Sequence, residues 1–182
     1  INENESAPTV TLATSATSIA ENAGSSLTLT ATLSVATTAN VTVGISTSGT
    51  GTEGTDYGTI SDITISAGDL TGTASFTPTD DSVYEGNETG VVAISTVSGG
   101  SATESGNQSV TITINENESS PTVTLATSAS SIAENAGSSL TLTATLSVVT
   151  TADVTVGIST SGTGTEGTDY STISDITIVA GQ

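Results

Sequence analysis

Apolar residues alternate with Thr and Ser along most of the chain, which is the period-two pattern of β-strands that bury one face. Within residues 26–34, Leu27, Leu29 and Leu33 fall on one face and the intervening Thr residues on the other. Clusters of Gly, Ser, Asn and Asp separate such runs, and no helical periodicity of useful length is present. The pattern predicts seven strands, near residues 9–13, 26–34, 40–47, 62–66, 72–77, 90–96 and 109–114.

Seven short strands within about 110 residues are typical of an immunoglobulin-like β-sandwich. We therefore predict an all-β fold. The Thr-rich faces suit this prediction, because β-branched side chains fit the pleated surface of a strand.

The chain repeats itself. Residues 1–69 align without gaps on residues 114–182, which gives a period of 113 residues (114 − 1). A period of this length corresponds to one sandwich domain per repeat. The seven differing pairs are Ala7/Ser120, Thr17/Ser130, Ala36/Val149, Asn40/Asp153, Gly58/Ser171, Ser66/Val179 and Asp69/Gln182.

The repeat predicts the domain organisation. Residues 1–7 are expected to end a preceding repeat, and residues 8–118 to form one complete domain. Residues 119–182 are expected to form the first part of a further, near-identical domain that is incomplete in this chain. The first residues do not resemble a signal peptide, so we expect the sequence to be an excerpt from a longer protein.

The composition of the chain argues against several classes of function. The chain has 19 acidic residues, no Lys, Arg, His or Cys, and a formal net charge of −19. Binding to nucleic acid or to anionic lipid requires basic residues, so neither partner is expected. No apolar run approaches the roughly 18 residues of a membrane span, so this segment is not expected to insert into a membrane.

The acidic residues are concentrated in particular loops. Residues 80–88 (DDSVYEGNE) place four carboxylates in nine residues between two predicted strands. Two carboxylates forced to within about 4 Å repel by roughly 4 kcal/mol at an effective dielectric near 20. Calcium accepts six to eight oxygen ligands with loose geometry and would relieve this repulsion. The alternative is that the acidic loops are simply solvated.

Four motifs in order resemble the Calx-beta domain, a family found in sodium–calcium exchangers, integrin β4 and very large bacterial surface proteins. They are residues 18–24 (SIAENAG), 51–57 (GTEGTDY), 66–69 (SAGD) and the acidic loop 80–88. The similarity covers about residues 8–118 and continues through 121–182. The resemblance implies an immunoglobulin-like sandwich of the Calx-beta type.

The resemblance also implies a set of Ca²⁺ ligands. Calcium-binding members use an opening Glu, the Asp of the D-Y pair, the acids of the D-D…E…E loop and a terminal acidic cluster. This chain departs from the family at the terminus, where residues 115–118 read NENE in place of a run of Asp. The implied ligands are Glu21, Asp56, Asp80, Asp81, Glu85, Glu88 and Glu116 in the first domain, Glu134 and Asp169 in the second, and Glu3 for a preceding domain.

An enzymatic role is not expected. Ser and Thr are plentiful, yet the chain has no His or Lys to activate them as nucleophiles. Carboxylate pairs can hydrolyse glycosides, but three Tyr and one Phe do not provide the aromatic groove typical of that chemistry.

Three functional hypotheses follow. The first is a calcium-rigidified spacer in a large bacterial adhesin or biofilm-matrix protein, secreted or on the cell surface, whose partners are adjacent copies of the same repeat. The second is a subunit of an extracellular filament, in which strand exchange between neighbouring chains completes the half domain. The third is a calcium-sensing regulatory module.

Overall fold

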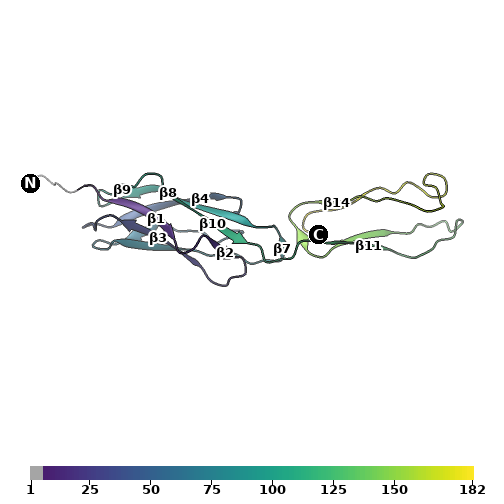
Figure 1. Ribbon diagram of the computed structural model, residues 1–182, viewed down its shortest axis with the longest axis horizontal. Helices are drawn as coiled ribbons and strands as arrows, with labels where there is room; N and C mark the ends of the chain where they lie inside the picture. The colour runs from purple at the N-terminus through teal and green to yellow at the C-terminus, as the bar shows by residue number, and fades with distance from the viewer. Residues whose placement is uncertain (1–5) are drawn as a thin grey trace, which may run out of the picture. The chain divides into compact units, whose positions relative to one another are not determined.

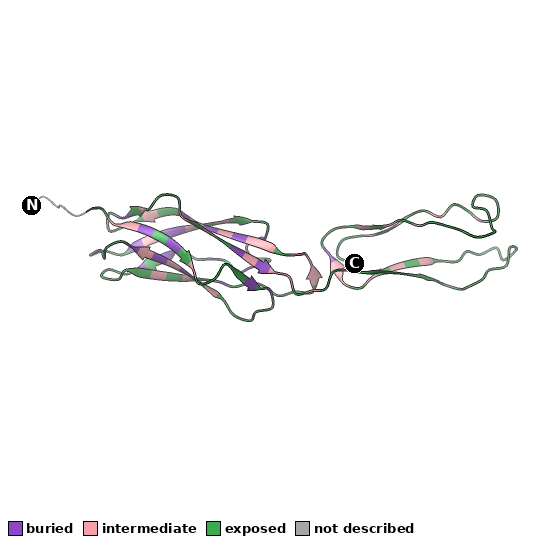
Figure 2. Cartoon of the chain, in the orientation of Figure 1, coloured by how far each residue is buried: buried purple, intermediate pink, exposed green. Residues whose placement is uncertain are grey.

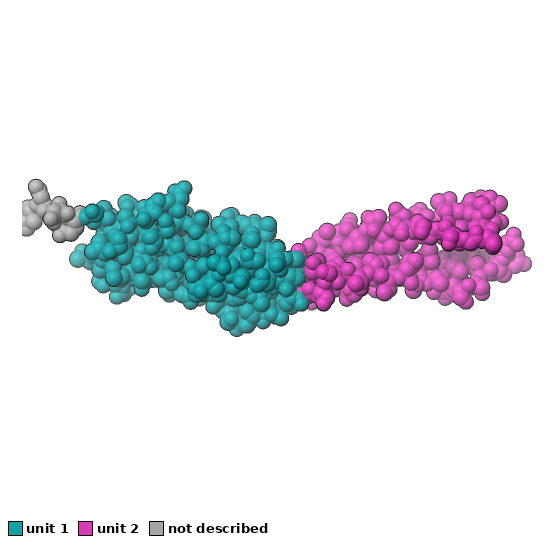
Figure 3. All heavy atoms as spheres, in the orientation of Figure 1, with its two compact units in different colours: residues 1–81, 86–117 teal, residues 82–85, 118–182 magenta. Residues whose placement is uncertain are grey.

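The computed structural model describes residues 6–182 and contains strands and turns but no helix in that range (Figure 1). The described residues therefore include no helix that could cross a bilayer. The chain divides into two compact units, coloured separately in Figure 3. Unit 1 comprises residues 1–81 and 86–117, and unit 2 comprises residues 82–85 and 118–182.

Unit 1 is a sandwich of two sheets. One sheet has the strand order β6-β3-β1-β9 and the other has the order β2-β10-β8-β4-β5. Most neighbours are antiparallel, but β1 with β9 and β2 with β10 are parallel pairs. The strands are β1 (Thr9–Thr14), β2 (Ser18–Ala20), β3 (Leu27–Leu33), β4 (Val41–Gly49), β5 (Ile63–Ile65), β6 (Thr71–Phe76), β8 (Glu88–Ser98), β9 (Thr103–Glu104) and β10 (Ser109–Asn115).

The all-β sandwich predicted from the alternating pattern is confirmed, and each of the seven predicted strands is present with small shifts at its ends. In β3, Leu29, Ala31 and Leu33 are buried while the intervening Thr residues are more exposed. Figure 2 shows the buried positions alternating along the strands of this unit. Burial of one face against the other sheet is what stabilises strands of this type.

The core of unit 1 contains a single aromatic pair. Tyr57 and Phe76 are almost fully buried, and their rings stack with centroids 4.7 Å apart. Around them pack aliphatic side chains from both sheets, including Leu29, Ile63 and Val92. Tyr57 and Phe76 are therefore core residues of unit 1.

Unit 2 contains shorter strands in three two-stranded sheets. Strand β11 (Val123–Thr127) pairs antiparallel with β12 (Leu142–Leu146), and β14 (Val154–Val156) pairs antiparallel with β15 (Ile176–Ile178). Strand β13 (Val149–Thr150) pairs in parallel with β7 (Val83–Tyr84). The sequence-based division at residue 118 remains a prediction.

Gly90 is required by the packing of the aromatic pair. A methyl group at this position would lie 2.6 Å from Cε2 and 2.8 Å from Cζ of Phe76, well inside van der Waals contact. We expect Gly90→Ala to destabilise unit 1 by about 1–3 kcal/mol, the usual range for an overpacked core. Equilibrium urea unfolding followed by circular dichroism measures this change.

Gly58 provides the matched control. The nearest neighbour of an added methyl group there is the Thr77 carbonyl oxygen, at 3.9 Å. The equivalent position of the second repeat already carries a side chain, Ser171. Gly58→Ala is therefore expected to leave the unfolding midpoint nearly unchanged. Equal destabilisation by the two substitutions would show that contact with Phe76 is not the reason for Gly90.

Candidate metal centre

Two glutamates leave neighbouring strands at the same end of the unit 1 sandwich. Strands β2 and β10 are parallel, and their register pairs Ala20 with Asn115. The next residue of each strand is a glutamate, so Glu21 and Glu116 emerge side by side. The backbone N–H of Glu21 donates a hydrogen bond to the Asn115 carbonyl oxygen at 2.9 Å, which continues the strand pairing up to the two carboxylates.

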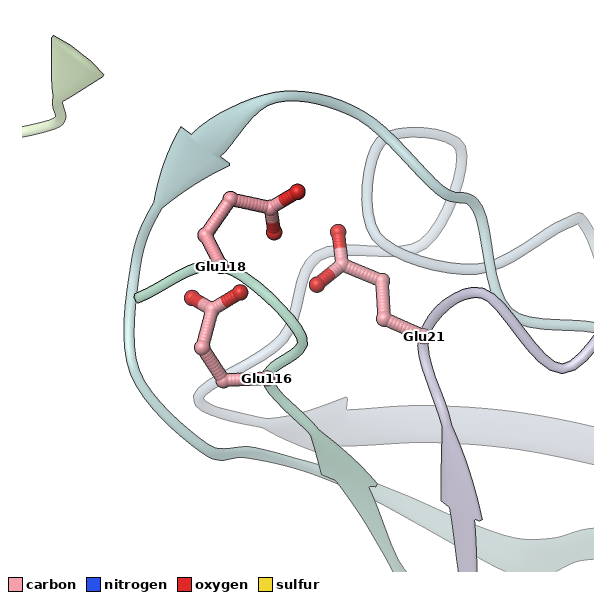
Figure 4. Close-up of side chains that lie close together, drawn as sticks. All are labelled: Glu21, Glu116 and Glu118. Carbon is pink, nitrogen blue, oxygen red and sulfur yellow. The ribbon is translucent and has the colours of Figure 1, made fainter. Parts of the chain in front are cut away.

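Figure 4 shows the carboxylates of Glu21 and Glu116 close together at this end of unit 1. One oxygen of Glu21 lies within 4.8 Å of one oxygen of Glu116. Glu118 follows Glu116 by two residues, and side chains at this spacing share a face of extended chain.

Two further groups of unit 1 involve the acidic loop. Oxygens of Glu21 and Asp81 lie within 4.8 Å of each other, as do those of Asp56 and Glu88. Glu85 and Glu118 belong to unit 2. The three acidic groups of unit 1 are therefore the pairs Glu21–Glu116, Glu21–Asp81 and Asp56–Glu88.

Backbone contacts position Asp56. Its Oδ2 accepts a hydrogen bond from the Thr52 N–H at 2.5 Å, and its own N–H donates to the Thr52 carbonyl oxygen at 2.9 Å. The Asp56 carbonyl oxygen accepts from the Thr79 N–H at 2.9 Å, immediately before the acidic loop. The turn at residues 52–56 is thus joined to the start of that loop.

Glu116 is held from the other end of the loop. Its Oε2 accepts a hydrogen bond from the Gly86 N–H at 2.8 Å, and its Oε1 accepts from the Asn117 N–H at 2.9 Å. Its own N–H donates to Oδ1 of Asn87 at 3.0 Å. Each carboxylate oxygen carries more than one lone pair, so these bonds orient the group and leave it able to bind a cation.

Electrostatic repulsion in this region is substantial. Carboxylates 4.8 Å apart repel by about 3–4 kcal/mol at an effective dielectric near 20, and the sequence supplies no Lys, Arg or His side chain to offset it. Glu21 is only 9% exposed, which weakens the screening by water.

Burial raises the pKa of the nearby Tyr57 hydroxyl, and the negative charges of Glu53, Asp56 and Glu88 raise it further, while a hydrogen bond with Thr47 lowers it.

Three predicted ligands of the two domains are not brought into these groups. Asp80 is exposed, and it belongs to none of the acidic groups found among residues 6–182. Glu134 and Asp169 are exposed as well and likewise join no group in the described part of the chain. Glu3 lies outside the described residues. Of the predicted set, the structure places Glu21, Asp56, Asp81, Glu88 and Glu116 in the groups of unit 1, and Glu85 belongs to unit 2.

Sequence reasoning did not select Glu118, although the signal was present. Glu116 and Glu118 stand two apart just past a strand, and the period-two rule places such residues on one face. The Ca²⁺ ligand set that the resemblance implies follows the family pattern and not this spacing, so it does not include Glu118.

Glu53 lies in the same region, and its carboxylate accepts hydrogen bonds from the surrounding chain. Its Oε2 accepts a hydrogen bond from the Thr47 hydroxyl at 2.6 Å, and its Oε1 accepts from the Ile60 N–H at 2.7 Å. The second repeat reproduces both bonds around Glu166. Glu53 therefore holds the chain around the turn at residues 52–56 by hydrogen bonds.

The donor set determines which metal would fit. Every side chain in the three groups is a carboxylate, and the sequence has neither imidazole nor thiol. Zinc and copper prefer nitrogen or sulfur ligands, whereas calcium and magnesium prefer oxygen. Calcium tolerates six to eight ligands in irregular geometry, which suits carboxylates drawn from several loops.

Unit 1 is an immunoglobulin-like β-sandwich module with carboxylates gathered at one end. A model of the Calx-beta domain matches residues 3–118 and again residues 116–178. The chain therefore belongs to the Calx-beta domain family.

Two solved structures are similar to this chain, and the first of them agrees with it at the level of fold. The apo form of the Calx CBD1 domain aligns with a TM-score of 0.50 and 18% identity, covering 60% of this chain and 99% of that one. CBD12 from CALX1.2 aligns with a TM-score of 0.47 and 19% identity, covering 54% of this chain and 41% of that one. No curated protein gives a significant match to the sequence.

Proposed function

We propose that this chain is a calcium-binding structural repeat, and that it serves as a calcium-rigidified spacer segment of a large extracellular protein of the adhesin or biofilm-matrix type. The observation that supports calcium binding most directly is the convergence of carboxylates from separate segments of a chain without basic side chains. Membership of the Calx-beta family supports the same proposal.

The residues of unit 1 that would hold the ion are Glu21, Asp81 and Glu116, while Asp56 and Glu88 would contribute to a second position. A divalent cation would replace repulsion between these carboxylates by attraction to a shared charge. The role of the bound cation would be structural, because calcium at such a site links segments that are far apart in sequence. No catalytic step is proposed.

The spacer role rests on the repeat and on the position of the acids. Sixty-two of 69 aligned positions are identical (69 − 7), so each copy would add length without adding a distinct binding site. Glu116 and Glu118 lie in the sequence that connects one repeat to the next. An ion bound to Glu116 would restrict that connection, which Pro121 already restricts through its fixed φ.

A calcium sensor is the competing proposal, since the carboxylates come from several loops that an ion would draw together. The two roles differ in affinity. Extracellular modules commonly bind calcium with dissociation constants of about 10⁻⁴–10⁻³ M, and sensors at about 10⁻⁷–10⁻⁵ M. Millimolar affinity with a modest change in small-angle scattering would support the spacer.

Substitution of Glu21 tests calcium binding by the acidic end. Glu21 belongs to two of the three groups, so Glu21→Gln removes a charge that both share. We expect it to weaken calcium binding about tenfold, equivalent to about 1.4 kcal/mol, or to abolish one binding event. Isothermal titration calorimetry of the whole chain with calcium measures both quantities.

Glu134→Gln is the matched control, because Glu134 occupies the same position of the second repeat and is exposed outside any group. It is expected to leave the titration unchanged. If Glu21→Gln and Glu134→Gln both bind calcium as the unsubstituted chain does, the acidic end of unit 1 is not the binding site.

A further inference from the structure

A short strand pairing in unit 2 holds two residues that come from the acidic loop of the sequence. Strands β7 and β13 run in parallel, with Val83 opposite Val149 and Tyr84 opposite Thr150. Both strands belong to unit 2. The Ser120 hydroxyl donates a hydrogen bond to the Tyr84 hydroxyl oxygen at 3.3 Å. Strand pairing and a side-chain hydrogen bond thus seat β7 on this unit, in the manner of an added strand.

The rest of a complete repeat does not supply a strand to this place. Ala36 and Thr37 of unit 1 are the counterparts of Val149 and Thr150. Among the described residues of unit 1, which include residues 70–117, no strand pairs with Ala36 or Thr37, and Ala36 is exposed. The seat of β7 is therefore not one that the second half of a repeat occupies.

The turn that presents this seat has the same hydrogen bonds in both units. Thr150 is 8% exposed, its hydroxyl donates to the Ala152 carbonyl oxygen at 2.8 Å, and its carbonyl oxygen accepts from the Gly181 N–H at 3.0 Å. Thr37 is also 8% exposed and makes the two equivalent bonds at 2.7 and 2.8 Å. Because unit 1 forms the turn without a paired strand, the turn does not depend on β7. A preformed seat reduces the ordering that opposes docking.

Two of the seven differences between the repeats lie at this seat. Val149 corresponds to an alanine of the first repeat and places a β-branched side chain opposite Val83. Such side chains favour strand pairing. Ser120 also corresponds to an alanine, and the hydroxyl that distinguishes it is the one that bonds to Tyr84. Both differences therefore add contact with the same two-residue strand.

Burial at the seat follows the pairing with β7. Val148 and Val149 are half-buried, whereas their counterparts Val35 and Ala36 are exposed in unit 1. Position 148 carries Val in both repeats, so residue type does not cause the difference there. Pairing with β7 is a contact that unit 2 has at this place and that the described residues of unit 1 do not make. Docking of β7 thus coincides with removal of apolar surface from water, which favours it.

We propose that Ser120, Val149 and Thr150 form a recognition site for residues 82–85. Ser120 and Val149 make the site selective, and a repeat with alanine at both positions, as the first repeat has, binds the same segment more weakly. The differences between near-identical copies then specify which repeat follows which in an array. This inference does not rest on calcium binding, because none of the contacts that carry it involves a carboxylate.

Disulfide trapping tests the docked contact in the whole chain, which contains no cysteine of its own. Val83→Cys with Val149→Cys should form a disulfide, since paired strand positions lie within the reach of about 4.4–6.8 Å between Cα atoms. The control combines Val83→Cys with Thr155→Cys, because Thr155 is exposed and pairs with β15 instead. We expect the first pair to oxidise at least about tenfold faster, because docking raises the effective concentration of its thiols. Equal rates, whether fast or slow, would overturn the proposal.

Reversion to the residues of the first repeat tests the selectivity. Val149→Ala and Ser120→Ala should each speed amide exchange in residues 82–85 at least about threefold, and the double reversion about tenfold, because local opening sets this rate. ¹⁵N NMR of the whole chain in calcium-containing buffer measures the exchange. Ser130→Thr and Ser171→Gly revert two differences outside the site and should change the rates less than about twofold.

Unchanged exchange after the double reversion would show that Ser120 and Val149 do not recognise the segment, and the proposal would be wrong. Calcium titration of the same variants separates this contact from the metal centre. The reverted chains should bind calcium as the unsubstituted chain does, whatever the outcome of the exchange measurement.

Discussion

Chelation of calcium is expected to lower the melting temperature of unit 1 by about 10 °C. A site at tenfold excess of calcium over its dissociation constant stabilises the folded state by about 1.4 kcal/mol. For a domain of 60–100 residues, each kcal/mol shifts the midpoint by about 4–8 °C. Differential scanning calorimetry with and without excess chelator measures the shift.

The control is magnesium, which is smaller than calcium and demands near-octahedral geometry. Replacing calcium by magnesium should restore only a small part of the lost stability. A melt that chelator leaves unchanged would show that unit 1 tolerates its converging carboxylates without an ion.

The second large effect on the stability of unit 1 is expected from substitution of Tyr57. The ring is 1% exposed and stacks on Phe76, so Tyr57→Ala removes half of the only aromatic pair in the unit 1 core. Truncation of a buried aromatic side chain costs about 3–5 kcal/mol. We expect the urea midpoint of unit 1 to fall accordingly.

Tyr170→Ala is the control that the repeat itself supplies. Tyr170 occupies the same sequence position, but it is half-buried, and residues 119–182 contain no counterpart of Phe76. The substitution should change stability by less than about 1 kcal/mol, as at other incompletely buried positions. Comparable losses from Tyr57→Ala and Tyr170→Ala would mean that the stacked pair is not the source of the effect.

The long strands could be predicted because their burial follows a local pattern. In β3 and β10, apolar and Thr residues alternate over seven residues each, and the buried face follows directly. Strands β2 and β9 were missed since each has only two or three residues and exists through parallel pairing with a distant segment. No local alternation marks such a strand.

The candidate site could be predicted only in part, because the sequence shows local patterns but not which distant segments meet. The density of acids in residues 80–88 is visible in the sequence, yet sequence alone does not show that Asp81 approaches Glu21 while Asp80 joins no acidic group among the described residues. The approach of Glu21 to Glu116 depends on the parallel register of β2 and β10. That register brings together residues 95 positions apart (116 − 21).

The two repeats also show why burial cannot be inferred from sequence identity. Leu12 and Leu125 have the same neighbours along the chain, but one is 7% and the other 54% exposed. Residues 70–118 make the difference, since they supply the opposing strands in unit 1. The same residues supply Asp81, Glu88 and Glu116 to unit 1.

A crystal structure of the chain grown with millimolar calcium tests the central claim most directly, namely that a divalent ion holds the carboxylates of unit 1 together. The account predicts density at about 2.3–2.6 Å from oxygens of Glu21, Asp81 and Glu116, the usual distance for calcium. Side chains directed apart into ordered water, with no ion among them at that concentration, would contradict it.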